Sequence, residues 1–217
     1  QKQFVDADLA NVSALTDLEE LSLFQWDITA AGLARLASLK ELRRLELHAP
    51  KVDLTAGAAT LREFTKLEGF LYADPAWVKP LEGMPNLRMF RFHRTGFPAD
   101  VLSSLKTYPK LTCLAFEACG LDEKEWLSLK EVKSLRLLLF GQNMKFSEDM
   151  QKRLATEMPA CEIRLTHPPF VLTPGKGAEV YALAGVKAEG TPMVAPSPGN
   201  FGIAFELGDF VKLPTLN

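Results

Sequence analysis

A leucine pattern that returns about every 24 residues constrains this 217-residue chain more than any other feature. Residues 15–23, Leu-Thr-Asp-Leu-Glu-Glu-Leu-Ser-Leu, have counterparts at 39–47 and, with aromatic replacements, at 108–116. Successive units begin at positions 15, 39, 64, 84, 108, 132 and 158, so the intervals run from 20 to 26 residues. A unit this short can bury its apolar side only against its neighbours, and the period therefore predicts a solenoid of stacked repeats.

Each of the first six units contains a triplet of apolar residues, and one residue separates the last two members. That spacing places both side chains on the same face of a β-strand. A second apolar set follows each strand at spacings of three and five, which indicates a short amphipathic helix. The triplets are Leu18/Leu21/Leu23, Leu42/Leu45/Leu47, Leu67/Phe70/Tyr72, Leu87/Phe90/Phe92, Leu111/Leu114/Phe116 and Leu135/Leu138/Phe140.

On these residues the chain resembles leucine-rich-repeat proteins, most closely the short bacterial type with helices on the outer side. The resemblance covers about residues 1–165. It implies an α/β solenoid with a curved parallel sheet on the concave side and short helices on the convex side. At the turn position where the family often has Asn or Cys, only Cys119 and Asn143 fit, with Thr95 as a substitute. Pro75 and Pro80 within the unit that begins at 64, and Pro85 just after it, argue against a helix there.

The pattern predicts two parts, a solenoid of six to seven repeats over residues 1–166 and a tail over 167–217. Residue 1 falls inside a repeat, which suggests a processed or truncated piece of a longer polypeptide. The alternative is a mature protein whose residues 1–14 form a helical cap.

The tail holds seven of the fourteen prolines and seven of the fourteen glycines, yet it keeps apolar runs at 180–183 and 201–205. Disordered segments are poorer in such residues. We therefore expect an extended, partly β tail with short strands near 179–187 and 201–207. A flexible linker to a downstream domain is the other interpretation.

Composition excludes some classes of partner. The net charge of −2 provides no basic field for nucleic acid or an anionic membrane, and no signal peptide or membrane-spanning stretch is evident. Three cysteines do not suggest a disulfide framework. Cytoplasmic and bacterial cell-envelope locations both stay open.

The strand register assigns side chains to the open concave face, charged in its N-terminal half and apolar in its C-terminal half. It places Tyr72 in the core and Ala73 on the open face, and it pairs Glu20 with Arg44 and His93 with Glu117 across strands. A contiguous exposed apolar patch usually marks a binding surface. The predicted partner-binding residues are Leu71, Met89, Arg91, His93, Leu137 and Leu139.

No catalytic, metal or cofactor site is expected. In the predicted register, equivalent positions on neighbouring strands form rows across the sheet. His48 and His93 lie in the same row on strands two apart, so about 10 Å separates them, which is too far for the two side chains to share a zinc ion. Cys113 and His93 lie in different rows, and nothing supplies an oxyanion hole. We therefore expect a non-enzyme.

Two of the three tryptophans, Trp77 and Trp126, match core positions of other repeats. Trp26 lies at a turn next to Phe24, and together they form a possible surface aromatic platform for a glycan.

These observations favour a non-catalytic protein–protein interaction module, a scaffold that is part of a larger polypeptide or complex. One alternative is a module for a glycan or another cell-envelope ligand. Another is a structural subunit whose tail adds a strand to a neighbour. Whether the tail docks in cis, over the apolar patch, or on another chain is also open.

Overall fold

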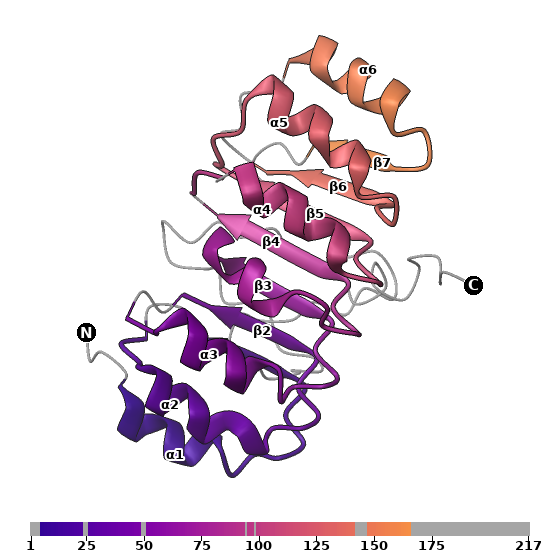
Figure 1. Cartoon of the computed structure of the whole chain (residues 1–217). Helices are drawn as coiled ribbons and strands as arrows, with labels where there is room; N and C mark the ends of the chain where they lie inside the picture. The colour runs from indigo at the N-terminus through magenta and orange to yellow at the C-terminus, as the bar shows by residue number, and fades with distance from the viewer. Residues whose placement is uncertain are drawn as a thin grey trace, which may run out of the picture.

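The computed structural model shows an α/β protein in which parallel strands form a sheet and helices cover one of its sides (Figure 1). Phe24, Asn143 and the predicted tail with its two short strands lie outside the described part of the chain. The structure describes residues 5–23, 26–48, 51–93, 95–97, 99–141 and 147–165.

Within these residues, seven strands form one open sheet in chain order, and each strand pairs in parallel with the next. Sequential parallel pairing without crossovers is the arrangement expected of a solenoid. The unit that begins at position 158 also contains a strand, Glu162–Leu165. The strands are β1 (Glu20–Leu23), β2 (Arg44–Leu47), β3 (Gly69–Ala73), β4 (Met89–His93), β5 (Cys113–Glu117), β6 (Leu137–Phe140) and β7 (Glu162–Leu165).

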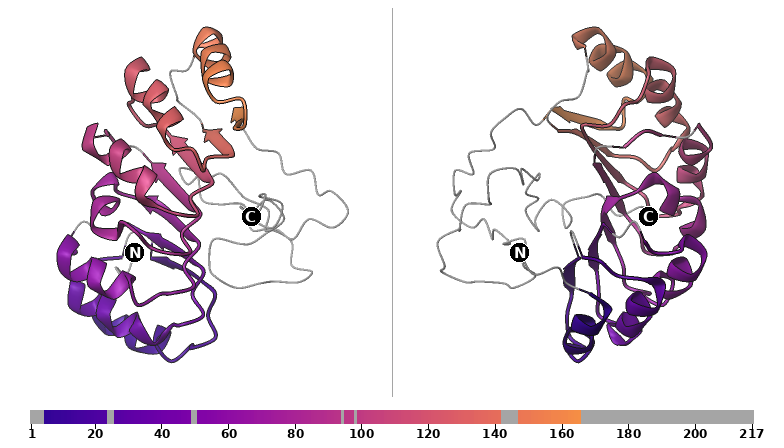
Figure 2. Two further views of the ribbon diagram at one scale, coloured as in Figure 1. Left: turned by 45° about the vertical axis from the view of Figure 1, so that its right-hand side comes forward. Right: turned by 90° about the vertical axis from the view of Figure 1, so that its left-hand side faces the viewer.

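Short helices connect the strands on the outer side of an arc, and the strands line its inner side (Figure 2). Polar caps define where these helices begin. Asp53 accepts a hydrogen bond from the backbone N–H of Ala56 at 2.9 Å, and Asp122 and Glu125 form a reciprocal capping box. The α-helices are α1 (Leu9–Val12), α2 (Ala30–Ala34), α3 (Leu54–Leu61), α4 (Ala99–Ser104), α5 (Glu123–Ser128) and α6 (Glu148–Glu157).

A main core fills the space between the sheet and the helices. Phe92, Phe116 and Phe140 stack along successive strands, with ring centroids 5.7 and 6.1 Å apart. Trp126 meets Phe116 and Phe140 edge to face at 5.0 Å each. Aromatic pairs in offset-stacked and edge-to-face geometry stabilise a core by more than their buried area alone contributes. The prediction that Trp77 and Trp126 are core residues is confirmed.

The unit between 64 and 84 has no α-helix, as its prolines predict. Its outer side consists of two 3-10 turns, Pro75–Trp77 and Lys79–Leu81. Trp77 packs so closely on α3 that a Cβ at Gly57 would lie 2.5 Å from its ring. The missing side chain at Gly57 thus permits the close approach of the indole to α3.

None of the described helices has the length and apolar character needed to cross a membrane. The three cysteines are reduced and buried, and burial raises the pKa of the Cys161 thiol to about 12. A thiol in that state is a poor nucleophile at neutral pH.

Candidate functional site

The inner side of the sheet, opposite the helices, is the candidate binding face. Strand pairing follows the predicted rows, with Met89 beside Cys113 and Cys113 beside Leu137. The side chains of the C-terminal half form a second hydrophobic cluster separate from the main core. We call this the inner apolar cluster: Met89, Cys113, Ala115, Leu137 and Leu139, with Leu71 packed against it.

The expectation of an exposed patch is wrong. Met89, Arg91, Leu137 and Leu139 are all buried, whereas Leu71 and His93 are half-buried. The sequence placed these side chains on the correct face of the sheet, but strand alternation does not reveal what packs against that face.

A buried ion pair lies at the centre of the inner face. A terminal nitrogen of the Arg91 guanidinium donates to Glu117 Oε2 at 2.6 Å, and the two residues are only 2% and 5% exposed. His93 Nδ1 lies 3.3 Å from the same oxygen. Charges so far from water are retained only when they are paired.

Tyr72 joins this pair and corrects the predicted register. Its ring centroid lies 4.5 Å from the Arg91 guanidinium carbon and 4.9 Å from the His93 ring centroid. Ala73, predicted on the open face, is instead buried in the main core. The two residues have therefore exchanged the predicted faces.

A β-bulge causes the exchange. Phe70 pairs with Phe90 and Ala73 with Phe92, so two residues of β3 oppose one residue of β4. Tyr72 adopts a φ of 53°, a left-handed conformation that is costly for a residue with a Cβ. Sequence reasoning missed Tyr72 because it assumed strict alternation. The 20-residue interval of this unit was the available signal of an irregularity.

The cross-strand pairs predicted for the inner face are present. Arg44 Nη1 lies 3.0 Å from Glu20 Oε1, and His93 approaches Glu117 as described. The Ser22 hydroxyl donates to Glu46 Oε2 at 2.6 Å. Glu46 is buried, so it is a second inner carboxylate that the sequence did not single out.

The pKa values of the two buried carboxylates of this face, Glu46 and Glu117, are shifted in opposite directions. Burial raises the pKa of Glu46, although the Ser22 hydrogen bond and the charges of Arg91 and His93 oppose that shift. Burial acts in the same direction on Glu117, but the His93 and Arg91 contacts outweigh it and lower its pKa. Glu117 is therefore held as a carboxylate by its neighbours. We define the inner polar cluster as Ser22, Glu46, Tyr72, Arg91, His93 and Glu117.

The proposed aromatic platform is only partly visible. Phe24 lies outside the described residues, and Trp26 is half-buried and packs against the main core. His48 is exposed. Among the described residues no group of three or more His, Cys, Asp or Glu side chains could hold a metal ion.

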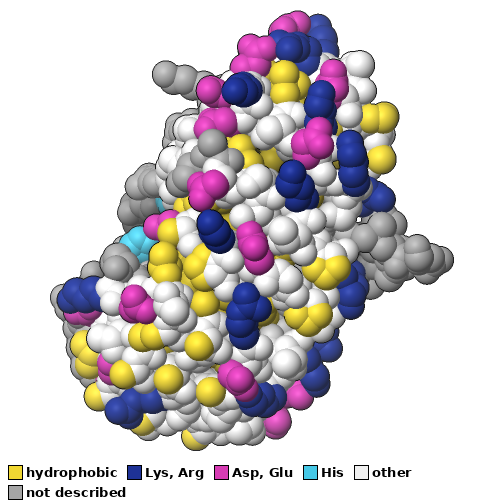
Figure 3. All heavy atoms as spheres, viewed as in Figure 1, with side chains coloured by type: hydrophobic (Ala, Val, Ile, Leu, Met, Phe, Trp, Pro, Cys, Tyr) yellow, Lys and Arg dark blue, Asp and Glu magenta, His cyan; other side chains and the backbone are white. Residues whose placement is uncertain are grey.

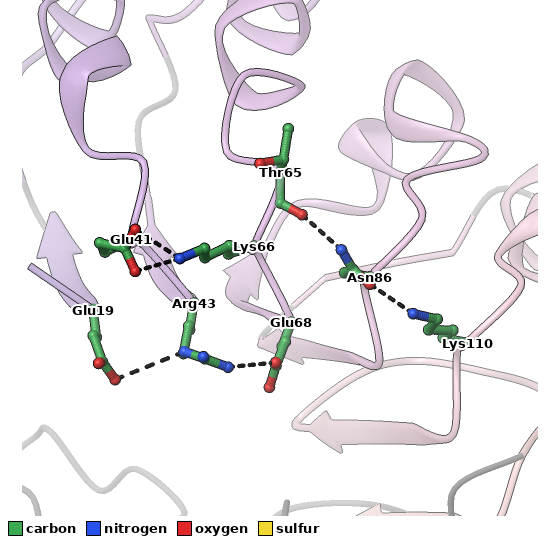
Figure 4. Close-up of polar contacts among 8 residues, drawn as sticks. All are labelled: Glu19, Glu41, Arg43, Thr65, Lys66, Glu68, Asn86 and Lys110. Atoms are coloured by element: carbon green, nitrogen blue, oxygen red, sulfur yellow. Dashed lines mark hydrogen bonds and ion pairs between the residues drawn. The ribbon is translucent and has the colours of Figure 1, made fainter.

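Exposed ion pairs occupy a different part of the molecule, the edge where the strands begin. Both carboxylate oxygens of Glu41 accept from Lys66 Nζ, at 2.6 and 2.5 Å. Arg43 lies between Glu19 and Glu68, immediately before the strands of three successive units (Figure 4).

Charges of both signs are interspersed over the outer, helix-covered side (Figure 3). Such a mixed surface is typical of solvated protein and presents no field of one sign for a highly charged partner.

Comparisons with known proteins are limited. No family model matches the chain, and no curated protein matches it. Among solved structures it is similar to Leiomodin-1 Actin-Binding Site 2 (ABS2) at 15% sequence identity and a TM-score of 0.37, over 71% of this chain and 86% of that chain. Because both the identity and the TM-score are low, we infer function from the geometry of the inner face alone.

Proposed function

We propose that the chain is a leucine-rich-repeat solenoid that binds a protein through its inner face, as one part of a larger polypeptide or complex. The observation that carries the proposal is the combination of the inner apolar cluster with the Arg91–Glu117 pair on the sheet side that the helices leave uncovered.

This arrangement has the composition of an interaction surface. Binding energy at protein interfaces concentrates in a few packed aromatic and arginine side chains surrounded by apolar area. Tyr72 and Arg91 stack on one another, and Leu71 lies beside them on the same face. A role confined to stability would be served at least as well by apolar residues, since buried ion pairs often add little net stability.

The proposal is for non-catalytic binding. The alternative of a glycan platform has less support, because Trp26 is partly covered by core contacts. The strand-addition alternative retains one supporting feature, since β7 is the last strand of the described sheet and has a sheet neighbour on only one side. An added strand would hydrogen-bond to backbone groups at such an edge.

A capture experiment with matched variants tests the binding face. The intact chain, Leu71→Glu and Leu15→Glu would each be immobilised and incubated with lysate of the source organism, and bound proteins would be identified by mass spectrometry. Leu15 is an exposed leucine outside the inner face, so it controls for the addition of one charge.

We expect a protein that binds the intact chain and Leu15→Glu but not Leu71→Glu. Circular dichroism must first show that both variants are folded. Equal capture by all three chains would contradict the proposal and move the binding surface away from the inner face.

A further inference from the structure

The inner apolar cluster is nearly excluded from water although it projects from a single sheet layer. Met89 and Ala115 are fully buried, and Cys113, Leu139 and Leu137 are 2, 4 and 5% exposed. Neighbouring side chains on a sheet shield one another's flanks, but their tips stay open unless a second layer packs over them. The described helices lie on the opposite side of the sheet, so they do not provide that layer (Figure 2).

We propose that residues 166–217, the C-terminal segment of this same chain, dock on the inner apolar cluster and regulate access of a protein partner to the inner face. The regulatory part of this inference depends on the proposed function, whereas the docking part does not.

The place where the described chain ends favours this occupant. The last described residue, Leu165, ends β7, which pairs with β6 so that Leu137 lies beside Glu162 and Leu139 beside Arg164. From β7 to β3 is four strand spacings, about 19 Å, which about six extended residues span. Residues 166–217 therefore reach every member of the cluster without a long linker.

The chemistry of the segment matches the apolar half of the face and not the charged half. Its 52 residues include seven charged ones: Lys176, Glu179, Lys187, Glu189, Glu206, Asp209 and Lys212. It also contains the apolar runs 180–183 and 201–205. Such runs gain most by covering β4 to β6, while Glu20 and Arg44 near β1 and β2 already pair with each other.

Docking within one chain has an effective concentration in the millimolar range for short connections. A protein partner that uses the same apolar surface must therefore compete with the segment. Weakening the segment's contacts should raise partner affinity, and this is the regulatory consequence of the proposal.

Cys113 provides a probe of the covered face in the full-length chain. It is 2% exposed and belongs to the inner apolar cluster. Replacing Cys119 and Cys161 by Ala would leave Cys113 as the sole thiol, because the chain has three cysteines. The rate of labelling by a small maleimide then reports how often the face is uncovered.

Substitutions in the segment then test whether it is the cover. In the single-thiol background, one variant carries Val180→Asp and Leu183→Asp, and a second carries Phe201→Asp and Phe205→Asp. We expect about ten-fold faster labelling in at least one of them, because a docked charge would lose its water. The matched control carries the same number of new charges at polar positions of the segment, Thr191→Asp and Ser197→Asp, and should change the rate less than about two-fold.

Three results would overturn the proposal. Unchanged labelling in both apolar-run variants, with circular dichroism showing native folds, would show that the segment does not cover the face. Equal acceleration by the control would show a general effect of charge. Labelling that slows as protein concentration rises would show that a second copy covers the face instead.

The same variants separate this proposal from the proposed function. Faster labelling together with stronger partner capture supports docking and regulation. Faster labelling with capture of no protein at the inner face supports docking and contradicts the binding function. Leu71-dependent capture with unchanged labelling supports binding and contradicts docking.

Discussion

The two faces of the sheet come from the same strands but are built differently. Outward from the sheet, toward the helices, lies an apolar core whose phenylalanine rings stack from strand to strand. On the inner side an apolar cluster surrounds the buried pair of Arg91 and Glu117. The described helices cover the first face, whereas none of them covers the inner apolar cluster (Figure 2).

The difference separates what stability requires from what it does not. The stacked phenylalanines are stabilised by apolar contacts between neighbouring repeats and need no polar partners. The repeating apolar positions of the sequence are therefore sufficient to form the main core. A buried ion pair is instead costly to desolvate and gives little net stability over apolar residues of the same shape. Its presence on the inner face fits a surface that is selected for recognition.

The largest expected effect comes from removing one member of the buried pair. Arg91→Met should lower the free energy of unfolding by about 3–5 kcal/mol, because Glu117 is left buried without its main partner. Chemical denaturation at pH 7 measures this. The matched change at the strand-start edge, Arg43→Met, should cost less than about 1 kcal/mol, since the side chains of Arg43 and its partner Glu19 are 45 and 64% exposed.

A double variant shows whether the pair or the packing matters. Arg91→Met with Glu117→Leu should recover most of the loss, since no unpaired charge remains. A double variant as unstable as Arg91→Met alone would mean that the packing of Arg91 against Tyr72, rather than its charge, stabilises this face.

Leu138 and Leu139 compare the two faces at adjacent positions of β6. Leu138 is fully buried in the main core, and Leu139 is 4% exposed on the inner side. Leu138→Ala should cost about 3–5 kcal/mol, because a fully buried core position can collapse only partly into the cavity. Leu139→Ala should cost about 1–2 kcal/mol if its cover can adjust. Equal losses in thermal or chemical unfolding would show that both faces are packed equally rigidly.

The two inner carboxylates should make stability depend on pH with opposite signs. The lowered pKa of Glu117 means that its contribution is present above its unfolded pKa, about 4.3, and is lost as pH falls through the folded value. Glu117→Gln should therefore lose about 1–2 kcal/mol relative to the original chain at pH 7 and progressively less below about pH 4.

Glu46 should behave in the reverse manner. Its raised pKa means that ionisation opposes folding above the folded value, while the protonated form favours folding as pH falls. Glu46→Gln keeps an oxygen for the Ser22 hydroxyl and should gain up to about 1 kcal/mol at pH 8 relative to acidic solution. Denaturation curves between pH 3.5 and 8 measure both variants, and parallel curves for the two would contradict this reading of the face.

Strand positions could be predicted from the sequence because they depend on local spacing. The triplets fix which strand residues share a face, so the pairing of Met89 with Cys113 followed from the repeat alone. The burial of Trp126 in the main core also followed from its match to apolar helix positions of other repeats. Pro75 and Pro80 likewise predicted that their unit has no α-helix, because proline lacks the backbone N–H that a helix needs as a donor.

The errors concern features that depend on more than local spacing. Tyr72 lies on the inner face because of a bulge, and its positive φ is tolerated only where the surrounding packing compensates for it. The burial of Leu137 and Leu139 depends on what lies over the sheet, which the period does not encode. Glu46 escaped notice because a lone glutamate in a strand gives no sign that it will be buried.

The smallest expected effect concerns the ion pairs along the edge where the strands begin. Lys66 contacts both carboxylate oxygens of Glu41, yet both side chains are about half exposed, at 46 and 42%. A double-mutant cycle with Lys66→Ala and Glu41→Ala should give a coupling of about 0.2–1 kcal/mol, and 1 M salt should reduce it, because exposed charges are screened by ions. A coupling that survives high salt, or that matches the Arg91–Glu117 coupling, would mean that this edge is much less accessible to water than its exposure indicates. The strength of charge pairing would then no longer distinguish the strand-start edge from the inner face of the sheet.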